Sequence, residues 1–145
     1  MKKILILVLL TVYPFAPAFA QPVAILPELP PIQESPAYKQ FRQKPQSELS
    51  KMMYLIQRFK NLNVEIQYNS HRYRIREISP LIMAYVFANF DRKGTAREWV
   101  IANASYSRTK RNPILVHLQD GSHERASELL LRELEILEKT VKTQA

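Results

Sequence analysis

Residues 64–76 read VEIQYNSHRYRIR, and this stretch decides the fold. Apolar and polar residues alternate on both sides of Asn69-Ser70, which is the pattern of two half-buried strands joined by a short turn. The stretch therefore predicts a β-hairpin with one apolar face and one basic face. The basic face carries Arg72, Arg74 and Arg76, each two residues from the next.

Helices are predicted on both sides of this hairpin. Before it, Ser47 can cap a helix in which apolar residues recur at spacings of three and four, the period of a core-facing helix. After it, Ser79 and Pro80 are typical of a helix start, because proline at the first helical position loses no hydrogen bond. Residues 81–90 are apolar nearly all round, which predicts a central, buried helix.

Two more helices and a third strand complete the expected fold. Thr95 and Glu98 match a capping box that opens one helix. Residues 114–118 are β-branched and aliphatic enough for a strand, and Ser122 can cap a last helix striped with leucines. The expected order is helix, strand, strand, helix, helix, strand, helix. We therefore expect a small α+β domain over residues 46–145 with a three-stranded, mainly antiparallel sheet.

The first 20 residues have the three parts of a secretory signal peptide. Lys2 and Lys3 precede an apolar run at residues 4–12, and Ala18-Phe19-Ala20 fits the small-x-small site that signal peptidase cleaves. The run is far shorter than the roughly 18 apolar residues that span a bilayer. Residues 1–20 are therefore expected to be removed on export, which leaves an exported chain in the periplasm with no transmembrane span.

Residues 21–45 contain six prolines and almost no apolar periodicity. This composition predicts an extended or disordered lead-in that acts as a spacer, with the folded part beginning near Gln46. The chain has no cysteine, so its stability has to come from an apolar core. Disulfides, Cys-ligated metals and thiol chemistry are excluded for the same reason.

Positive charge is concentrated in the middle of the chain. Residues 61–112 hold nine Lys or Arg against four acidic residues, whereas residues 113–145 hold four against six. This asymmetry predicts one electropositive face that attracts phosphate-bearing partners. Arginines two apart on a strand lie about 6.6–7 Å from each other, close to the spacing of successive phosphates, and residues 105–113 add a mobile basic loop. The candidate binding residues are Arg72, Arg74, Arg76, Arg108, Lys110 and Arg111. The alternative is a solvated hairpin face whose charges only prevent sheet-to-sheet association.

No catalytic or metal site is predicted. His117, Asp120 and His123 lie within seven residues, but His117 is expected to point away from the apolar face of its strand, and Asp120 before Gly121 is ordinary turn chemistry. The hydroxyl-rich stretch 105–109 lacks the glycine-rich turn that a nucleophilic serine needs. With two glycines, the chain has no phosphate-cradling loop. We therefore expect no enzyme activity, no cofactor and no bound metal.

Several short segments resemble a known family. They are Lys51-Met-Met-Tyr-Leu-Ile, Ile66-x-Tyr68-Asn69-x-x-x-Tyr73, Thr95-x-x-Glu98-Trp99-Val100, Ala104-Ser105-x-Ser107, and Asp120-Gly121 before a leucine-rich helix. Together they resemble the YfeK-like family of small exported bacterial proteins of unknown function. The resemblance covers most of the chain from Leu49 to Leu137, with Ser70 standing where a turn glycine is common. It implies the fold and export, and it implies no chemistry.

Two hypotheses of different classes follow. The first is an exported, non-enzymatic envelope protein that binds an anionic lipid, an anionic polymer or a protein through the hairpin and the 105–113 loop. Nucleic acid is the least expected of these anions outside the cytoplasm. The second is a structural or assembly protein whose C-terminal helix docks on another chain. Its docking face is Leu129, Leu130, Leu134 and Leu137, with Glu133, Glu135 and Glu138 around them. A hydrolase is a distant third.

Overall fold

The predicted hairpin is present in the structure, a computed structural model that describes Leu26 and residues 29–145. Strand β1 (Glu65–Tyr68) pairs antiparallel with β2 (His71–Arg74) across a two-residue turn. Asn69 adopts a φ of 57° in that turn, a left-handed conformation that asparagine tolerates better than most residues. The alternation in residues 64–76 was thus sufficient to locate the hairpin and its turn.

The sheet has four antiparallel strands rather than the expected three, in the order β2-β1-β3-β4. Strand β3 (Leu115–His117) lies where it was predicted, and β4 (His123–Arg125) is the additional strand. β4 is short and has no apolar residue, so only its pairing with β3 identifies it. Ser122, expected to cap the last helix, lies instead in the β3–β4 turn, where its carbonyl accepts the N–H of Leu118 at 2.9 Å.

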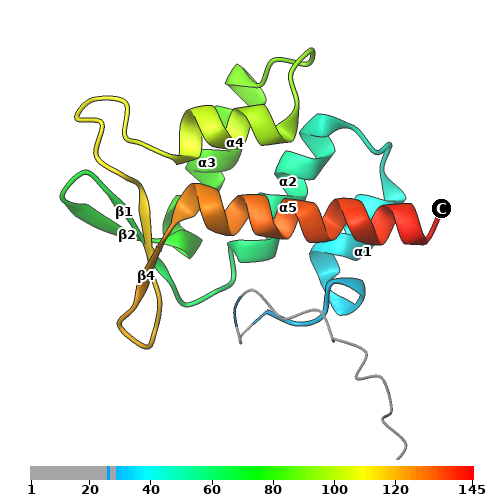
Figure 1. The fold of residues 1–145 in the computed structure, drawn as a ribbon, viewed down its shortest axis with the longest axis horizontal. Coiled ribbons are helices and arrows are strands. Elements are labelled where there is room, and N and C mark those ends of the chain that lie inside the picture. Colours follow the sequence, from blue (N-terminus) through cyan, green and yellow to red (C-terminus); the bar gives the residue numbers. More distant parts are fainter. Residues whose placement is uncertain (1–25, 27–28) are drawn as a thin grey trace, which may run out of the picture.

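The described residues form five α-helices and one short 3-10 helix (Figure 1). Their bounds are η1 (Ile32–Glu34), α1 (Pro36–Gln43), α2 (Glu48–Phe59), α3 (Ile75–Asn89), α4 (Ala96–Ala104) and α5 (Ala126–Thr143). The N-caps predicted at Ser47 and Thr95 are confirmed, and each is part of a reciprocal capping box. The expected order of elements is wrong because it lacks α1 and β4.

Helix α3 begins at Ile75, directly after β2, and not at Ser79-Pro80 as predicted. The N–H of Ile75 donates to the carbonyl of Val64 at 3.1 Å, so the end of the hairpin and the start of the helix are joined. Pro80 therefore lies inside the helix, where it cannot donate to the carbonyl of Arg76. The hydroxyl of Ser79 donates to that carbonyl at 3.4 Å and partly replaces the missing hydrogen bond.

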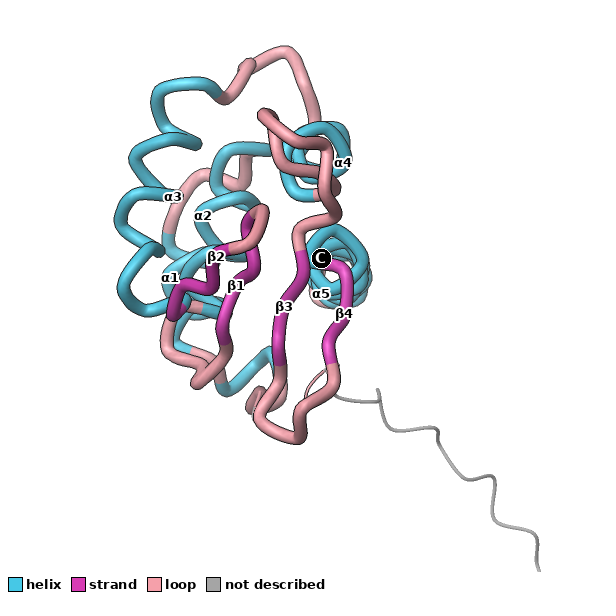
Figure 2. The backbone as a smooth tube through the Cα atoms, turned by 90° about the vertical axis from the view of Figure 1, so that its left-hand side faces the viewer, coloured by secondary structure: helices cyan, strands magenta, loops and turns pink. Residues whose placement is uncertain are grey.

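Helix α3 is also not the buried central helix that its composition predicted. Between residues 81 and 90 only Val86 is fully buried, whereas Leu81 is 71% exposed and Phe87 is 61% exposed. The central helix is α2, which packs against α1, α3, α4 and α5. In Figure 2, α3 lies along the edge of the molecule at the left.

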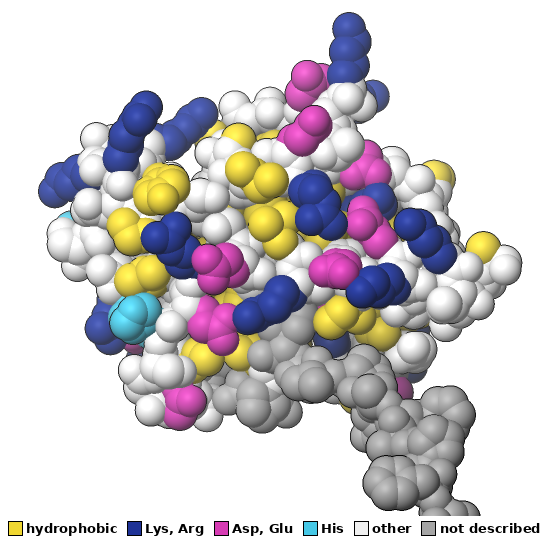
Figure 3. Space-filling view, viewed as in Figure 1, with side chains coloured by type: hydrophobic (Ala, Val, Ile, Leu, Met, Phe, Trp, Pro, Cys, Tyr) yellow, Lys and Arg dark blue, Asp and Glu magenta, His cyan; other side chains and the backbone are white. Residues whose placement is uncertain are grey.

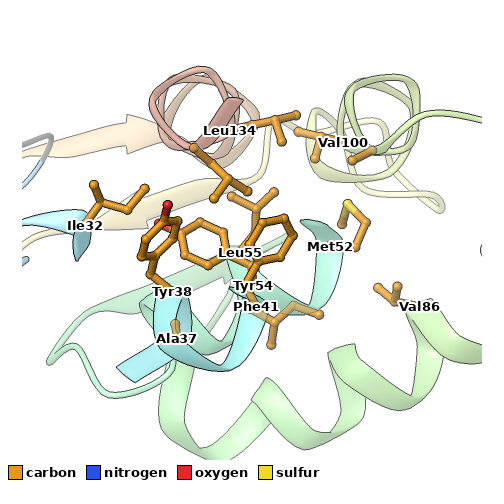
Figure 4. Packing of buried hydrophobic residues seen from close by; sticks show 13 residues of the cluster. Ile32, Ala37, Tyr38, Phe41, Met52, Tyr54, Leu55, Val86, Val100 and Leu134 are labelled. Carbon is orange, nitrogen blue, oxygen red and sulfur yellow. The ribbon is translucent and has the colours of Figure 1, made fainter. Parts of the chain in front are cut away.

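Within the segment expected to be an extended lead-in, residues 32–34 and 36–43 are helical, and most of their apolar side chains are buried. Ser35 caps α1, accepting the N–H of Tyr38 at 3.1 Å, and Pro36 occupies the first turn. Tyr38 and Phe41 are 5% and 4% exposed, and Figure 4 shows their rings packed with Tyr54 and Leu55 in one core cluster. The chain is therefore folded before the expected boundary near Gln46, because Pro36 begins a helix and does not mark extended chain. The signal peptide expected at residues 1–20 lies outside the described residues.

A buried polar network joins α2, α5 and the segment before α1. Glu133 of α5 accepts hydrogen bonds from the Tyr54 hydroxyl and, at 2.8 Å, from Arg58 Nε. Arg58 Nη2 also donates to the carbonyl of Pro30 at 2.6 Å, which fixes the chain before α1. Burial and the charge of Glu133 raise the pKa of Tyr54, so the phenol keeps its proton and acts as a donor.

None of the helices in the described part of the chain is long and apolar enough to cross a membrane.

Candidate anion-binding surface

The sheet has one polar face that no described helix covers. Strand register places Arg72, Gln67, Leu115 and Arg125 in one row and Arg74, Glu65, His117 and His123 in a second row on the same side. We call these eight residues the outer face. Ile66 and Val116 lie between the two rows and point the other way, into the core. Figure 2 looks onto the sheet, with the helical layer behind it.

Three of the predicted binding residues meet at the β2 edge of the outer face. Arg72 and Arg74 lie on β2 as predicted, whereas Arg76 lies in the first turn of α3 and not on the hairpin. Arg72, Arg74 and Arg76 line a shallow hollow of about 660 Å³, which Glu65 and His117 also line. Arg72 lies 3.8 Å from Glu65, and Arg74 lies 3.7 Å from Glu77. Both pairs are exposed to solvent and contribute little to stability, so the arginines can exchange these partners for an incoming anion.

The other three predicted residues lie in a separate group, on a loop that hydrogen bonds hold closed. The N–H of Ser107 donates to the carbonyl of Asn112 at 2.8 Å, and the N–H of Asn112 donates to the Ser107 hydroxyl at 3.2 Å. Ser107 itself is buried. These bonds close the loop into a turn that presents Arg108, Lys110 and Arg111 to solvent. Figure 3 shows Lys and Arg side chains gathered at the upper left, where Figure 1 has this loop.

The loop is attached to the turn end of the hairpin. The N–H of Arg108 donates to the Tyr68 hydroxyl at 3.0 Å, and Asn69 Nδ2 donates to the Thr109 hydroxyl at 3.1 Å. The Arg108 guanidinium lies over the ring of Tyr85 in α3, 5.3 Å from its centre, which is a cation–π geometry. The six predicted residues therefore form two groups: one around the hollow, and one at the hairpin turn beside α3.

Arg125 is a member of the outer face that sequence reasoning missed. Its guanidinium lies 5.7 Å from the ring centre of Tyr106 and donates to the hydroxyl of Tyr106 at 3.3 Å. Alternation of His123 and Arg125 would have indicated this position, but only if β4 had been recognised as a strand. The outer face and the hollow together carry four arginines, namely Arg72, Arg74, Arg76 and Arg125, against the carboxylates of Glu65 and Glu77.

His117, which was expected to point away from the apolar face of its strand, lies on the outer face together with His123. His117 and His123 are opposite each other on β3 and β4, with ring centres 5.6 Å apart. His117 Nε2 is hydrogen-bonded to Gln67 Oε1 at 2.7 Å. Partial burial, then the positive charges of Arg72 and of His123, lower the pKa of His117. Among the described residues no group of three or more His, Cys, Asp or Glu could hold a metal ion.

Most of the leucines expected to dock on a second chain are buried in the core of this chain. Leu129, Leu134 and Leu137 of α5 are at most 2% exposed and belong to the two core clusters. Glu133, expected to flank that face at the surface, is buried in the network with Arg58. The face of α5 that carries these leucines is therefore covered by the chain itself.

Comparison with known proteins finds no match: no family model, no curated protein and no solved structure is similar to this chain. The resemblance to the YfeK-like family stays a prediction. The outer face and the 105–113 loop are therefore the features of this chain that indicate a function.

Proposed function

We propose that this chain is an exported, non-enzymatic envelope protein that binds an anionic partner through the outer face and the neighbouring 105–113 loop. The observation that carries the proposal is the gathering of Arg72, Arg74 and Arg125 with two histidines on a sheet face that no described helix covers. Arginine is suited to this role because its planar guanidinium binds phosphate or carboxylate oxygens in pairs.

The arrangement of charges favours an extended anion over a small one. Arg72 and Arg74 lie two residues apart on β2, about 6.6–7 Å from each other, so successive phosphates of one polymer or neighbouring lipid headgroups can contact both. Arg108, Lys110 and Arg111 lie at the turn end of the same hairpin and lengthen the basic region. An isolated small anion would leave most of these cations unused.

The test of this function is a double charge reversal, Arg72→Glu with Arg74→Glu, assayed against inorganic polyphosphate at low salt. We expect the wild type to bind, and we expect the reversal to weaken binding about tenfold or more and to make it less dependent on salt. Folding should survive, because each of these exposed charges contributes about 1 kcal/mol or less to stability.

The matched control is Lys39→Glu with Arg42→Glu, which makes the same change of net charge on the exposed side of α1. Its affinity for polyphosphate should stay close to that of the wild type. Equal losses in the two variants would mean that net charge alone drives binding and that the outer face is not a site. Absence of polyphosphate binding by the wild type would also remove the proposal.

Binding should also depend on pH through His117. An anion favours the charged imidazolium of His117, so the affinity for polyphosphate should rise as pH falls below about 6.5, the ordinary pKa of histidine. The free protein should respond in the opposite direction: the lowered pKa of His117 means that the unfolded chain binds more protons, so stability decreases as pH falls through this range. Titration of binding between neutral and mildly acidic pH measures the effect. His117→Gln should flatten the profile; an unchanged slope in that variant would exclude His117 as its cause.

A further inference from the structure

Helix α3 presents an apolar stripe to solvent. Its exposed positions between the first turn and the last residue, Asn89, are Pro80, Leu81, Ala84, Phe87 and Ala88, which follow the helical spacing of three and four along one side. From Ile78 to Asn89 the helix has no charged residue at all. A surface helix normally carries polar or charged residues on its outward face, so this stripe requires a functional explanation.

The apolar surface continues beyond the helix. Phe87 is part of the wall of a hollow of about 280 Å³ that lies between α1, α2 and α3. Phe41, Leu49 and Met53 also line this hollow. The stripe and the hollow together form one continuous apolar region. Its area is therefore larger than that of the exposed side chains of Leu81 and Phe87 alone.

Cations surround this apolar region. Arg76 precedes the stripe, Arg92 and Lys93 follow α3, and Arg108 lies beside the stripe on the ring of Tyr85. Two carboxylates are near the ends of the helix, and both have partners: Glu77 lies 3.7 Å from Arg74, and Asp91 accepts the N–H of Lys93 at 2.9 Å. The edge of the stripe is therefore positive at both ends.

We propose that α3 docks on an anionic lipid bilayer, with Leu81 and Phe87 entering the headgroup–acyl boundary and the surrounding cations contacting lipid phosphates. This inference rests on the proposed function and names the partner as a membrane. Apolar side chains can enter the headgroup–acyl boundary of a membrane, and Lys and Arg beside them can contact the anionic headgroups. A soluble polyanion would leave the stripe exposed, and a second copy of the chain would bring cations at both ends of the stripe against cations.

The experiment is binding of the full chain, recovered after export, to vesicles of phosphatidylglycerol and phosphatidylcholine, with phosphatidylcholine vesicles and polyphosphate as the other two arms. The test variant is Leu81→Gln with Phe87→Gln, which keeps helix propensity and removes only exposed apolar area. Ile101→Gln is the matched control, because Ile101 is an exposed apolar residue, 53% accessible, on another helix. All variants share one N-terminus, so the apolar run near the start of the chain cannot explain a difference between them.

We expect the wild type to bind the anionic vesicles and not the neutral ones. Leu81→Gln with Phe87→Gln should bind the anionic vesicles about tenfold or more weakly and keep its affinity for polyphosphate. Ile101→Gln should bind like the wild type. The fluorescence of Phe87→Trp, made in a Trp99→Phe background, should shift to the blue on anionic vesicles.

Four outcomes overturn the inference in distinguishable ways. If the wild type binds polyphosphate but not anionic vesicles, the proposed function stands and docking of α3 on a membrane is refuted. If it binds neither, both proposals are refuted. Vesicle binding that is unchanged in Leu81→Gln with Phe87→Gln means adsorption by charge alone. Equal losses in the test variant and in Ile101→Gln would show that the stripe on α3 has no special role.

Discussion

Replacement of Glu133 by alanine is expected to lower the free energy of unfolding by about 3–5 kcal/mol. The carboxylate is 1% exposed and accepts hydrogen bonds from Tyr54 and Arg58, which are 1% and 8% exposed. Without it, the Arg58 guanidinium is a buried charge with only the Pro30 carbonyl as its remaining partner. Urea denaturation of the wild type and the variant measures the difference.

Glu135→Ala is the matched control for this prediction. Glu135 lies on the same helix and forms an ion pair with Lys139 at 2.7 Å, but both side chains are more than half exposed. Its loss should cost about 0.5 kcal/mol or less. If Glu133→Ala proved as mild as Glu135→Ala, the buried network would not be a stabilising element of the fold.

The parts of the fold that could be predicted from sequence are those fixed by short-range chemistry. Alternation around Asn69-Ser70 located the hairpin, and the hydroxyls of Ser47 and Thr95 located two helix starts. Each depends on residues at most a few positions apart, so no tertiary information is needed. Strand β4 was not predicted because only its pairing with β3 defines it as a strand, and its three polar residues show no apolar–polar alternation.

Burial was the property that sequence could not assign. The apolar run after Pro80 was expected at the centre, yet α2 holds that place and α3 faces solvent. Nothing in the composition of a helix says which of several apolar helices is covered by the others. The same limit applies to the C-terminal leucines, which look identical in sequence whether they face this chain's own core or a partner.

The candidate site could be predicted only in part, because some of its residues come together through contacts between strands that are distant in sequence. Arg72 and Arg74 follow from alternation within one strand, and the structure places both on the outer face. Arg125 and the histidine pair join them through pairing of β1 with β3 and of β3 with β4, which are contacts between segments about 50 and eight residues apart. The 105–113 loop was recognised by its charge, but its attachment to Tyr68 depends on a side-chain hydrogen bond that no local pattern encodes.

Replacement of Phe41 by alanine is expected to cost about 3–5 kcal/mol, which is a large share of the stability of a domain of this size. Phe41 is 4% exposed and contacts the ring of Tyr54 edge-on, with ring centres 5.9 Å apart. Its neighbour Tyr38 donates to Gln144 Oε1 at 2.6 Å, so α1 is also joined to the end of α5. Removal of α1 would expose this whole surface, and a chain that starts at Gln46 should not fold with native stability.

The decisive comparison is with Phe87→Ala, which makes the same chemical change at a side chain that is 61% exposed. Its cost should be about 0.5 kcal/mol or less, because little apolar area is lost from the core. Thermal unfolding of the two variants therefore separates two accounts of residues 29–45. If Phe41→Ala unfolds at nearly the temperature of Phe87→Ala, α1 is a loosely attached spacer, as the prolines first indicated. If only Phe41→Ala is strongly destabilised, α1 is a structural part of the domain, because its aromatic residues belong to the core cluster around α2.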